Sequence, residues 1–336
     1  MLNNKTVAVV IPAYNEETQI EQVVTSMPDF VDRIVVVNDC STDGTAAVVQ
    51  HLMKREESAA GKTAIREYAP DETKYNRADI VLHQLQKKEM EQYVPAEIVN
   101  AAPETDRIIL INHLQNGGVG AAIARGYKWC LDHRFDCTAV MAGDGQMDPS
   151  ELESICRPIV DEGIDYSKGN RLIHRSAWLI VPKVRFIGNS VLSILTKIAS
   201  GYWHVSDTQC GYTAISLKAL QAIRIYDIYK SYGMPNDLLV KLNVAFCTLK
   251  EVDIKPVYNV GEQSKMKIWK VMPRVTALLC KSFFKRLWIK YLIRDFHPLF
   301  LLYHFSFILG CISIPYMVKI FRIATFTNDN VPTLTM

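Results

Sequence analysis

The sequence TVAVVIPAYNEE, residues 6–17, joins a short β-branched run to an abrupt polar ending. Residues 7–11 (VAVVI) are apolar at every position, which is typical of a strand buried on both faces of a parallel sheet. Similar runs occur at 34–37, 108–112 and 138–142, with helical patterns at 16–26, 41–51 and 120–132 between them. This alternation of strands and helices predicts an α/β fold with a mostly parallel sheet.

Polar clusters follow three of these strands, at 12–16 (PAYNE), 38–45 (NDCSTDGT) and 143–149 (GDGQMDP). Each cluster alone could be a turn that caps a helix. The carboxyl ends of parallel strands lie at one edge of a sheet, where α/β proteins bind ligands. Asp39 and Asp144 at these ends suit a nucleotide, because its base needs polar partners and its diphosphate needs a cation with oxygen ligands.

The overall composition conceals a basic segment. The 336 residues are 49% hydrophobic and 22% charged, with a net charge of +3, which excludes a disordered chain and a globally basic nucleic-acid binder. Residues 263–294 contain nine Lys and Arg and no Asp or Glu, so the remainder of the chain carries −6. A tract of this kind can lie on anionic membrane lipids.

The run at 298–318 (PLFLLYHFSFILGCISIPYMV) has no Asp, Glu, Lys or Arg over 21 residues, close to the ~20 that a helix needs to cross a bilayer. A buried core helix is the alternative, because His304, Ser306 and Pro315 dilute the run. The excess of basic residues before it predicts that the preceding chain is cytoplasmic. The N-terminus shows no secretory leader and the eight cysteines form no CxxC pair, so we expect a reduced compartment.

The domain organisation follows from these patterns. We expect a catalytic domain at 1–262, a basic amphipathic interfacial segment at 263–296, a transmembrane or re-entrant helix at 297–322 and a tail at 323–336. Within the first domain, the charged stretch 54–105 reads as an insertion with a helical middle at 77–93. Its charge pattern favours a solvent-exposed helical insertion, for which contact with another subunit is one possible use.

The ordered motifs PAYNE, NDCSTDGT, NGGVGAAIARG, GDGQMDP, KGNR, DTQCGY and GEQSK resemble those of inverting glycosyltransferases of family 2. They are similar in particular to the branch that contains dolichol-phosphate mannose synthase and polyprenyl-phosphate glycosyltransferases. The resemblance spans residues 6 to about 270, apart from the insertion. It implies a GT-A fold and transfer of a sugar from a nucleotide diphosphate sugar to a polyprenyl phosphate, with Mg²⁺ or Mn²⁺.

The resemblance assigns donor-site residues by position. The nucleotide-sugar-binding residues that it implies are Pro12, Ala13, Tyr14, Glu16, Asp39, Asn116, Gly118, Gly120 and Asp144. It implies Asp144 and Gln146 as metal ligands, with Asp148 as a less certain neighbour. Two positions depart from the family pattern, since Asn38 and Ala142 stand where an acid is common. The loss at Ala142 weakens the implied ribose contact but leaves the metal assignment in place.

Cations are expected on the acceptor side, because a lipid phosphate must approach another anion. The resemblance implies Arg171, Arg185 and Asn189 as phosphate-binding residues, and a guanidinium suits bidentate contact with an oxyanion. Lys265, next to Ser264, is expected to offset charge on the leaving diphosphate. Asp207 and Asp237 match acidic positions that orient substrate. The implied catalytic set is therefore Asp144, Arg171, Asp237 and Lys265.

Two alternatives to this activity stay open, and a third is disfavoured. The same fold could act on a glycan, protein or glycolipid acceptor, or it could be a non-catalytic nucleotide-sugar-binding relative, as Asn38 and Ala142 suggest. A nucleotidyltransferase is disfavoured, because PAYNE is not the glycine-rich opening loop of that class. His113, His174 and His204 lie near motifs without metal-ligand spacing, which favours surface or packing roles.

Overall fold

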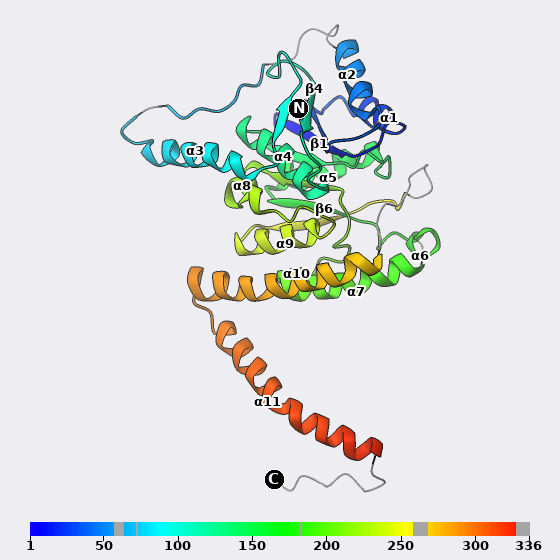
Figure 1. Cartoon of the computed structure of the whole chain (residues 1–336). Coiled ribbons are helices and arrows are strands. Elements are labelled where there is room, and N and C mark those ends of the chain that lie inside the picture. The colour runs from blue at the N-terminus through cyan, green and yellow to red at the C-terminus, as the bar shows by residue number, and fades with distance from the viewer. Residues whose placement is uncertain (57–63, 72, 182, 258–267, 327–336) are drawn as a thin grey trace. The chain divides into compact units, whose positions relative to one another are not determined.

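A computed structural model describes residues 1–56, 64–71, 73–181, 183–257 and 268–326 (Figure 1). The chain forms two compact units, Met1–Phe283 and Phe284–Met336. The first unit holds the whole sheet and the motifs described above, apart from GEQSK at 261–265, which lies outside the described residues.

The first unit is built on one sheet with the strand order β3-β4-β2-β1-β5-β7-β6-β8. Strands β4, β2, β1 and β5 run parallel, while β3 and β7 run antiparallel to their neighbours and β6 pairs in parallel with β8. The strands are β1 (Val7–Ala13), β2 (Arg33–Asn38), β3 (Ala96–Ile98), β4 (Ile108–His113), β5 (Cys137–Val140), β6 (Tyr166–Asn170), β7 (Thr213–Ser216) and β8 (Leu249–Asp253). The α/β prediction is confirmed.

The helices connect and cover these strands. They are α1 (Ile20–Thr25), α2 (Thr45–Glu56), α3 (Arg77–Glu89), α4 (Val119–Asp132), α5 (Leu152–Glu162), α6 (Ala177–Ile180), α7 (Lys183–Ser200), α8 (Leu217–Ala222), α9 (Met234–Val244), α10 (Ile268–Trp288) and α11 (Leu299–Phe326). Shorter 3₁₀ turns are η1 (Met90–Gln92), η2 (Pro149–Glu151) and η3 (Ile225–Asp227), and η4 (Ile289–Arg294) is a π-helix.

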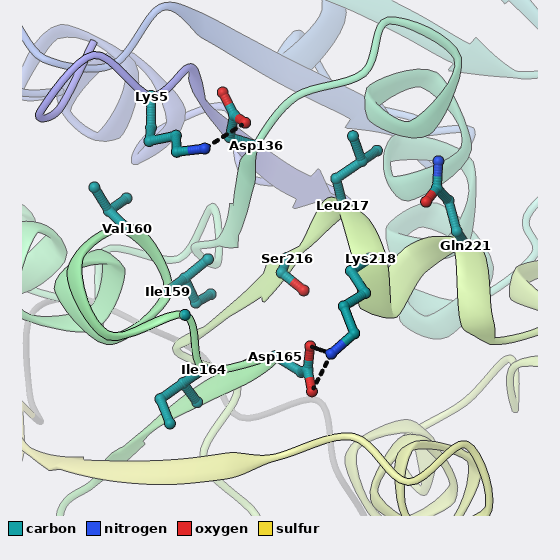
Figure 2. Close-up of a pocket in the computed structure, with 11 residues that line it drawn as sticks. Lys5, Asp136, Ile159, Val160, Ile164, Asp165, Ser216, Leu217, Lys218 and Gln221 are labelled. Carbon is teal, nitrogen blue, oxygen red and sulfur yellow. Dashed lines mark hydrogen bonds and ion pairs between the residues drawn. The ribbon is translucent and has the colours of Figure 1, made fainter.

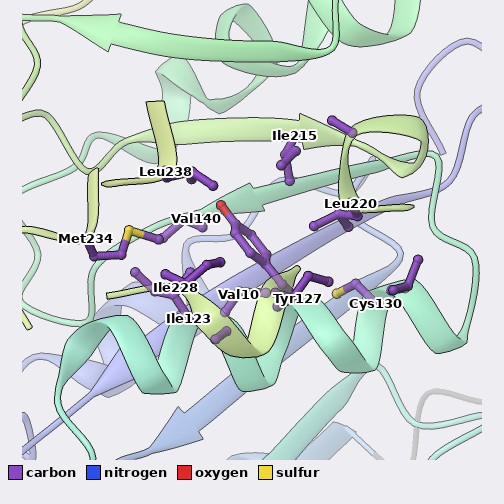
Figure 3. Close-up of a cluster of buried hydrophobic side chains, with 14 of the residues drawn as sticks. Val10, Ile123, Tyr127, Cys130, Val140, Ile215, Leu220, Ile228, Met234 and Leu238 are labelled. Carbon is purple, nitrogen blue, oxygen red and sulfur yellow. The ribbon is translucent and has the colours of Figure 1, made fainter. Parts of the chain in front are cut away.

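Both faces of the sheet are buried, because alternate residues of each central strand point to opposite cores. In β1, Ala8 and Val10 belong to one core, whereas Val7, Val9 and Ile11 belong to the other. Helix α4 covers the first face, where its Tyr127 packs beside Val10 (Figure 3). Helices α1, α2 and α5 supply residues of the second core. The uniform apolar runs of the sequence are therefore explained by burial on two sides.

Helices α7, α9 and α10 form a further small core in the first unit. Leu192 and Ala199 of α7 pack with Val240 of α9 and with Val275 and Leu279 of α10. Figure 1 shows α7 and α10 lying along each other. This packing fixes α7, which follows the KGNR motif, within the first unit.

The second unit contains the end of α10, η4 and α11. In the described part of the chain, the helix from Leu299 to Thr325 is the one long and apolar enough to cross a membrane, and 6% of its most apolar window is buried. The ring of Trp288 meets Phe300 edge-on, with ring centroids 5.2 Å apart. Helix α11 is long enough to cross a bilayer.

Candidate active site

The polar loops that follow β1, β2, β4 and β5 lie at one edge of the sheet. Parallel pairing places Ala13 beside Asn38, and Asn38 beside Asn112. Strand β5 pairs with β1 up to Val140. The first and last of these motifs begin at residues 12 and 143, which are 131 positions apart in the sequence, yet the strand register brings them to one edge.

The first two loops are braced against each other by hydrogen bonds. The Asn15 N–H donates to the Ser41 hydroxyl over 3.0 Å, and the Asn15 carbonyl oxygen Oδ1 accepts from the Thr42 N–H over 2.8 Å. The Glu16 N–H donates to the Thr45 hydroxyl over 2.9 Å. PAYNE and NDCSTDGT therefore form one ordered surface.

The predicted donor-site residues of the first loop differ in exposure. Pro12 and Ala13 complete β1, Glu16 is partly buried, and the Tyr14 side chain is 39% exposed. An exposed ring at this edge suits contact with a flat ligand such as a nucleotide base.

Asp39 lies beneath this surface and is almost fully buried. The His113 ring nitrogen Nδ1 lies 2.7 Å from Asp39 Oδ1, which also accepts the Gly117 N–H over 2.8 Å, while Oδ2 accepts the Gly118 N–H over 2.7 Å. Burial alone would raise the pKa of Asp39, but these hydrogen bonds outweigh burial and lower the pKa of the carboxyl. The structure thus gives Asp39 the task of ordering the glycine-rich loop.

His113 is a residue whose contact with the site the sequence did not reveal. Its side chain is fully buried, which agrees with a packing role, one of the two roles that the sequence favours. Only the pairing of Asn38 with Asn112 places His113 next to Asp39, 74 residues away in the chain. The sequence does not show how β2 and β4 are aligned, so the contact between His113 and Asp39 is visible only once the strand pairing is known.

Gly118 and Gly120 lie against the protein's own backbone. A Cβ atom on Gly118, whose φ is +87°, would lie 2.4 Å from the Lys230 carbonyl oxygen, and one on Gly120 would lie 2.0 Å from the Tyr229 oxygen. The Gly120 N–H also donates to the Lys230 oxygen over 3.0 Å. The glycines were expected to admit the nucleotide, whereas the close neighbour in the structure is the 229–230 segment. Asn116, in the same loop, donates to the Asp39 carbonyl oxygen over 3.2 Å.

Asp237 holds that segment in place. Its Oδ2 accepts the Tyr229 N–H over 2.9 Å and forms an ion pair of 2.5 Å with Lys241. The residue is 6% exposed. These contacts are structural, and the expected role of Asp237 toward substrate remains a prediction.

The loop after β5 carries the predicted metal ligands. The Gln146 N–H donates to Asp144 Oδ1 over 3.1 Å, so the two residues belong to one tight turn. A Cβ on Gly143 would lie 3.3 Å from the Pro12 carbonyl oxygen, which shows that this loop runs beside PAYNE. Asp148 accepts the Ser150 N–H over 2.9 Å at the start of η2. The pKa of its carboxyl is lowered first by a hydrogen bond from the Ser150 side chain and then by this backbone bond.

The donor set in this loop fits a hard divalent cation. Within the described ranges, no three His, Cys, Asp or Glu side chains form a cluster that could hold a metal ion. Mg²⁺ commonly binds through one or two carboxylates together with substrate phosphates and water. The Asp144 carboxylate and the Gln146 amide oxygen fit that pattern, in which phosphate oxygens complete the coordination shell.

Arg171 follows β6 and forms a bidentate ion pair with Asp207. Nε lies 2.8 Å from Oδ2 and Nη2 lies 3.1 Å from Oδ1, while the Arg171 N–H donates to Oδ2 over 3.2 Å. The Asp207 side chain is fully buried and that of Arg171 is 23% exposed. Burial would raise the pKa of Asp207, but the Arg171 guanidinium outweighs it and lowers the pKa. The bidentate contact therefore holds the guanidinium in a fixed plane.

The remaining acceptor-side predictions are described less fully. Asn189 is partly buried in α7, and Arg185 belongs to the first turn of the same helix. Lys265 and Ser264 lie outside the described residues. The short helix α6 lies between Arg171 and α7, so these two positions follow Arg171 farther along the chain.

A separate hollow of about 340 Å³ lies at the opposite edge of the sheet, beside the first residues of β5 and β6 (Figure 2). Lys5 pairs with Asp136 over 3.4 Å and Lys218 pairs with Asp165 over 3.1 Å. None of the predicted site residues lines it. Its carboxylates are already neutralised, and the strand-end loops, not this hollow, carry the candidate chemistry.

The fold and the site define a class of protein. A mixed, mostly parallel sheet with polar loops at the carboxyl ends of its parallel strands is the GT-A arrangement of glycosyltransferases. The sequence profile described as glycosyl transferase family 2 matches residues 8–63 and 91–224. The chain belongs to this family, as the motifs predicted.

Curated relatives resemble most of the chain. It is 27% identical over 257 residues to UDP-N-acetylglucosamine–dolichyl-phosphate N-acetylglucosaminyltransferase of Methanococcus voltae, covering 76% of this chain and 87% of the relative. It is 24% identical over 311 residues to a dolichyl-phosphate beta-glucosyltransferase of Trichomonas vaginalis, covering 86% and 76%. It is 22% identical to polyprenol monophosphomannose synthase of Mycolicibacterium smegmatis, covering 68% and 69%.

A solved structure supports the fold. Glucosyl-3-phosphoglycerate synthase of Mycobacterium tuberculosis, in complex with Mn²⁺, UDP and glucosyl-3-phosphoglycerate, aligns with a TM-score of 0.52 at 17% identity. The alignment covers 84% of this chain and 80% of that chain. At this identity the likeness concerns the fold alone.

Proposed function

We propose that the protein transfers a sugar from a UDP- or GDP-sugar to a polyprenyl phosphate at a membrane surface, with Mg²⁺ or Mn²⁺. The observation that carries the proposal is the placement of Arg171, whose partly exposed side chain pairs with the buried Asp207, at the end of β6 and ahead of the apolar helix α7 in the chain. The named relatives that use dolichyl or polyprenyl phosphate agree with this acceptor class.

The outer face of α7 supports a lipid acceptor. Ile187, Val191, Ile194 and Ile198 recur at intervals of four, three and four residues, and each is between 42% and 60% exposed. This spacing places them on one side of the helix. An exposed apolar stripe of this kind suits contact with the hydrocarbon boundary of a membrane. Arg171 would then face a phosphate whose lipid tail lies along α7.

The anchor and its charges support the membrane side. Lys281, Lys285, Arg286, Lys290 and Arg294 precede α11, which is the membrane-length helix of the described chain. The positive-inside rule favours the cytoplasm for residues before such a span. We therefore place the catalytic unit on the cytoplasmic face.

The chemistry is a single in-line displacement. A phosphate monoester has its second pKa near ~6, so its dianion attacks the anomeric carbon at neutral pH without a protein base. The new C–O bond forms as the bond between the sugar and the nucleoside diphosphate breaks, which inverts the anomeric centre. A divalent cation held by Asp144 and Gln146 would offset charge on the leaving diphosphate.

The protein's own residues supply position and charge. Arg171 would pair with the acceptor phosphate, and the braced loops around Asn15 and Asp39 would hold the nucleotide. Lys265 would add a positive charge at the diphosphate. Asp207 acts on the reaction through Arg171.

A donor panel tests the proposal. Full-length protein in detergent is given UDP-N-acetylglucosamine, UDP-glucose or GDP-mannose with undecaprenyl phosphate and Mn²⁺, and labelled product is partitioned between organic solvent and water. We expect an organic-soluble, acid-labile product with one donor and its loss with EDTA. Product found only in water would contradict the lipid acceptor, and activity that resists EDTA would contradict the metal.

A further inference from the structure

Glu251 connects three parts of the acceptor side. It lies in β8, at the outer edge of the sheet, where it pairs in register with Lys168 of β6. Its Oε1 accepts the Ser206 N–H over 2.8 Å and the Asp207 N–H over 3.1 Å. Its Oε2 accepts from the Asn170 side-chain amide over 2.8 Å. No motif in the sequence distinguishes this residue.

These bonds link Glu251 to both partners of the Arg171–Asp207 ion pair. Asn170 directly precedes Arg171, and its Oδ1 accepts the Leu172 N–H over 2.9 Å, which shapes the turn that carries Arg171. At the other end, Glu251 fixes the backbone of Asp207. One carboxylate therefore sets the separation of the two partners.

The charges of the cluster balance. Lys168 and Arg171 are the cations, and Asp207 and Glu251 are the anions. Lys168 is fully buried and donates to the Cys210 carbonyl oxygen. A buried charge needs compensation by a partner or by hydrogen bonds. Loss of the Glu251 charge would leave the cluster with a net positive charge. It would also weaken the hydrogen bonds from residue 251 to Asn170 and to the backbone of residues 206 and 207.

We propose that Glu251 is a positioning residue that orients Arg171 toward the acceptor phosphate. The inference rests on the proposed function, because it concerns the same acceptor site. It predicts that Glu251 affects the use of the acceptor and leaves the nucleotide site intact.

The substitution Glu251→Gln tests this role at constant size. A glutamine oxygen can still accept the N–H groups of residues 206 and 207, but its NH₂ group then faces the Asn170 amide donor. Asn170 cannot turn over without losing the bond from Leu172. At least one hydrogen bond is therefore lost while the shape is kept.

Glu162→Gln is the matched control. Glu162 pairs with Lys250, the neighbour of Glu251 in the chain, over 2.6 Å at the exposed surface. The substitution Glu162→Gln also removes a carboxylate that contacts β8, through Lys250, but it leaves the turn that carries Arg171 unchanged. Both variants are assayed as full chains with undecaprenyl phosphate and the active donor.

We expect Glu251→Gln to raise the KM for undecaprenyl phosphate about tenfold, since the loss of a hydrogen bond to a charged group has effects of about this size. The KM for the donor and the Kd for UDP should stay within about twofold, which also shows that the variant is folded. Glu162→Gln should match the wild type. Equal increases in both KM values, or none, would overturn the proposal.

A double-mutant cycle with Arg171→Lys separates positioning from general stability. If Glu251 acts through Arg171, Glu251→Gln adds less than about twofold to the acceptor KM of Arg171→Lys. Fully multiplicative effects would overturn the proposal. Wild-type protein that makes no lipid product would instead refute the proposed function, so the two failures are distinguishable.

Discussion

The donor and acceptor sides of the site are held together by different forces. On the donor side, loops after parallel strands are joined by hydrogen bonds between backbone N–H groups and nearby polar side chains, as at Asn15 and Ser41. On the acceptor side, the turn that carries Arg171 is fixed by buried charges from β6, β8 and the loop before β7. Each side thus contains a buried carboxylate, but Asp39 on the donor side accepts two backbone N–H groups, whereas Asp207 on the acceptor side pairs with a guanidinium.

The largest expected effect is on the donor side, at Asp144. Asp144→Asn removes the one carboxylate of the predicted cation site, so we expect transfer to fall roughly 10²–10³-fold, as when an electrostatic stabiliser is lost. Initial rates over a Mn²⁺ titration measure it. Glu153→Gln is the control, since this exposed carboxylate pairs with Arg157 on α5, outside the predicted cation site. Equal losses in both variants would show that the effect does not come from the cation site.

The next effect is on the acceptor side, at Asp207. Asp207→Asn leaves Arg171 facing a neutral partner, so we expect an acceptor KM about 10-fold or more higher and a free energy of unfolding about 3–5 kcal/mol lower. Acceptor kinetics and denaturant unfolding measure the two quantities. A rise in donor KM of the same size would remove the distinction between the two sides.

The same substitution tests the pH dependence. The pKa of Asp207 is lower in the folded protein than the ordinary value near ~3.9, so its ion pair stabilises the fold above that pH and is lost as the pH falls through the folded pKa. Wild-type protein should lose stability below about pH 4, and Asp207→Asn should lose less over the same range. Parallel acid-unfolding curves would contradict this account.

A smaller effect is expected at Gly120. A Cβ there would collide with the Tyr229 carbonyl oxygen, so Gly120→Ala should lower the free energy of unfolding by about 1–3 kcal/mol and weaken UDP binding. Thermal unfolding and calorimetry measure the changes. Gly188→Ala in α7 is the control, because its Cβ would meet no described atom within 4 Å. A neutral Gly120→Ala would mean that the 229–230 segment moves easily.

The smallest effect is expected on the exposed stripe of α7. Ile194→Gln should raise the KM for polyprenyl phosphate in vesicles about threefold, because one apolar contact with lipid is lost. For a short-chain, water-soluble acceptor, the KM of Ile194→Gln should equal that of the wild type. Leu82→Gln, equally apolar and exposed on α3, is the control. Equal effects with both acceptors would show that the stripe does not contact lipid.

Local sequence patterns predicted much of the fold and the donor side. The β-branched runs at 7–11 and 34–37 became β1 and β2, and the polar loops that follow them met at one edge. The acceptor side was harder, because Glu251 reaches Asn170 across 81 residues and the antiparallel β7 lies between β5 and β6. No spacing along the chain encodes that arrangement, and His113 needed the register of β2 and β4 for the same reason.

Helix α3 has a practical consequence. It lies within residues 64–90, the stretch that the family profile skips, and none of its residues is buried. A label or a rigid fusion partner at its solvent-facing positions would leave the sheet and both substrate sides intact. The helix is thus a built-in attachment point for imaging or immobilising this small enzyme while its catalysis is observed.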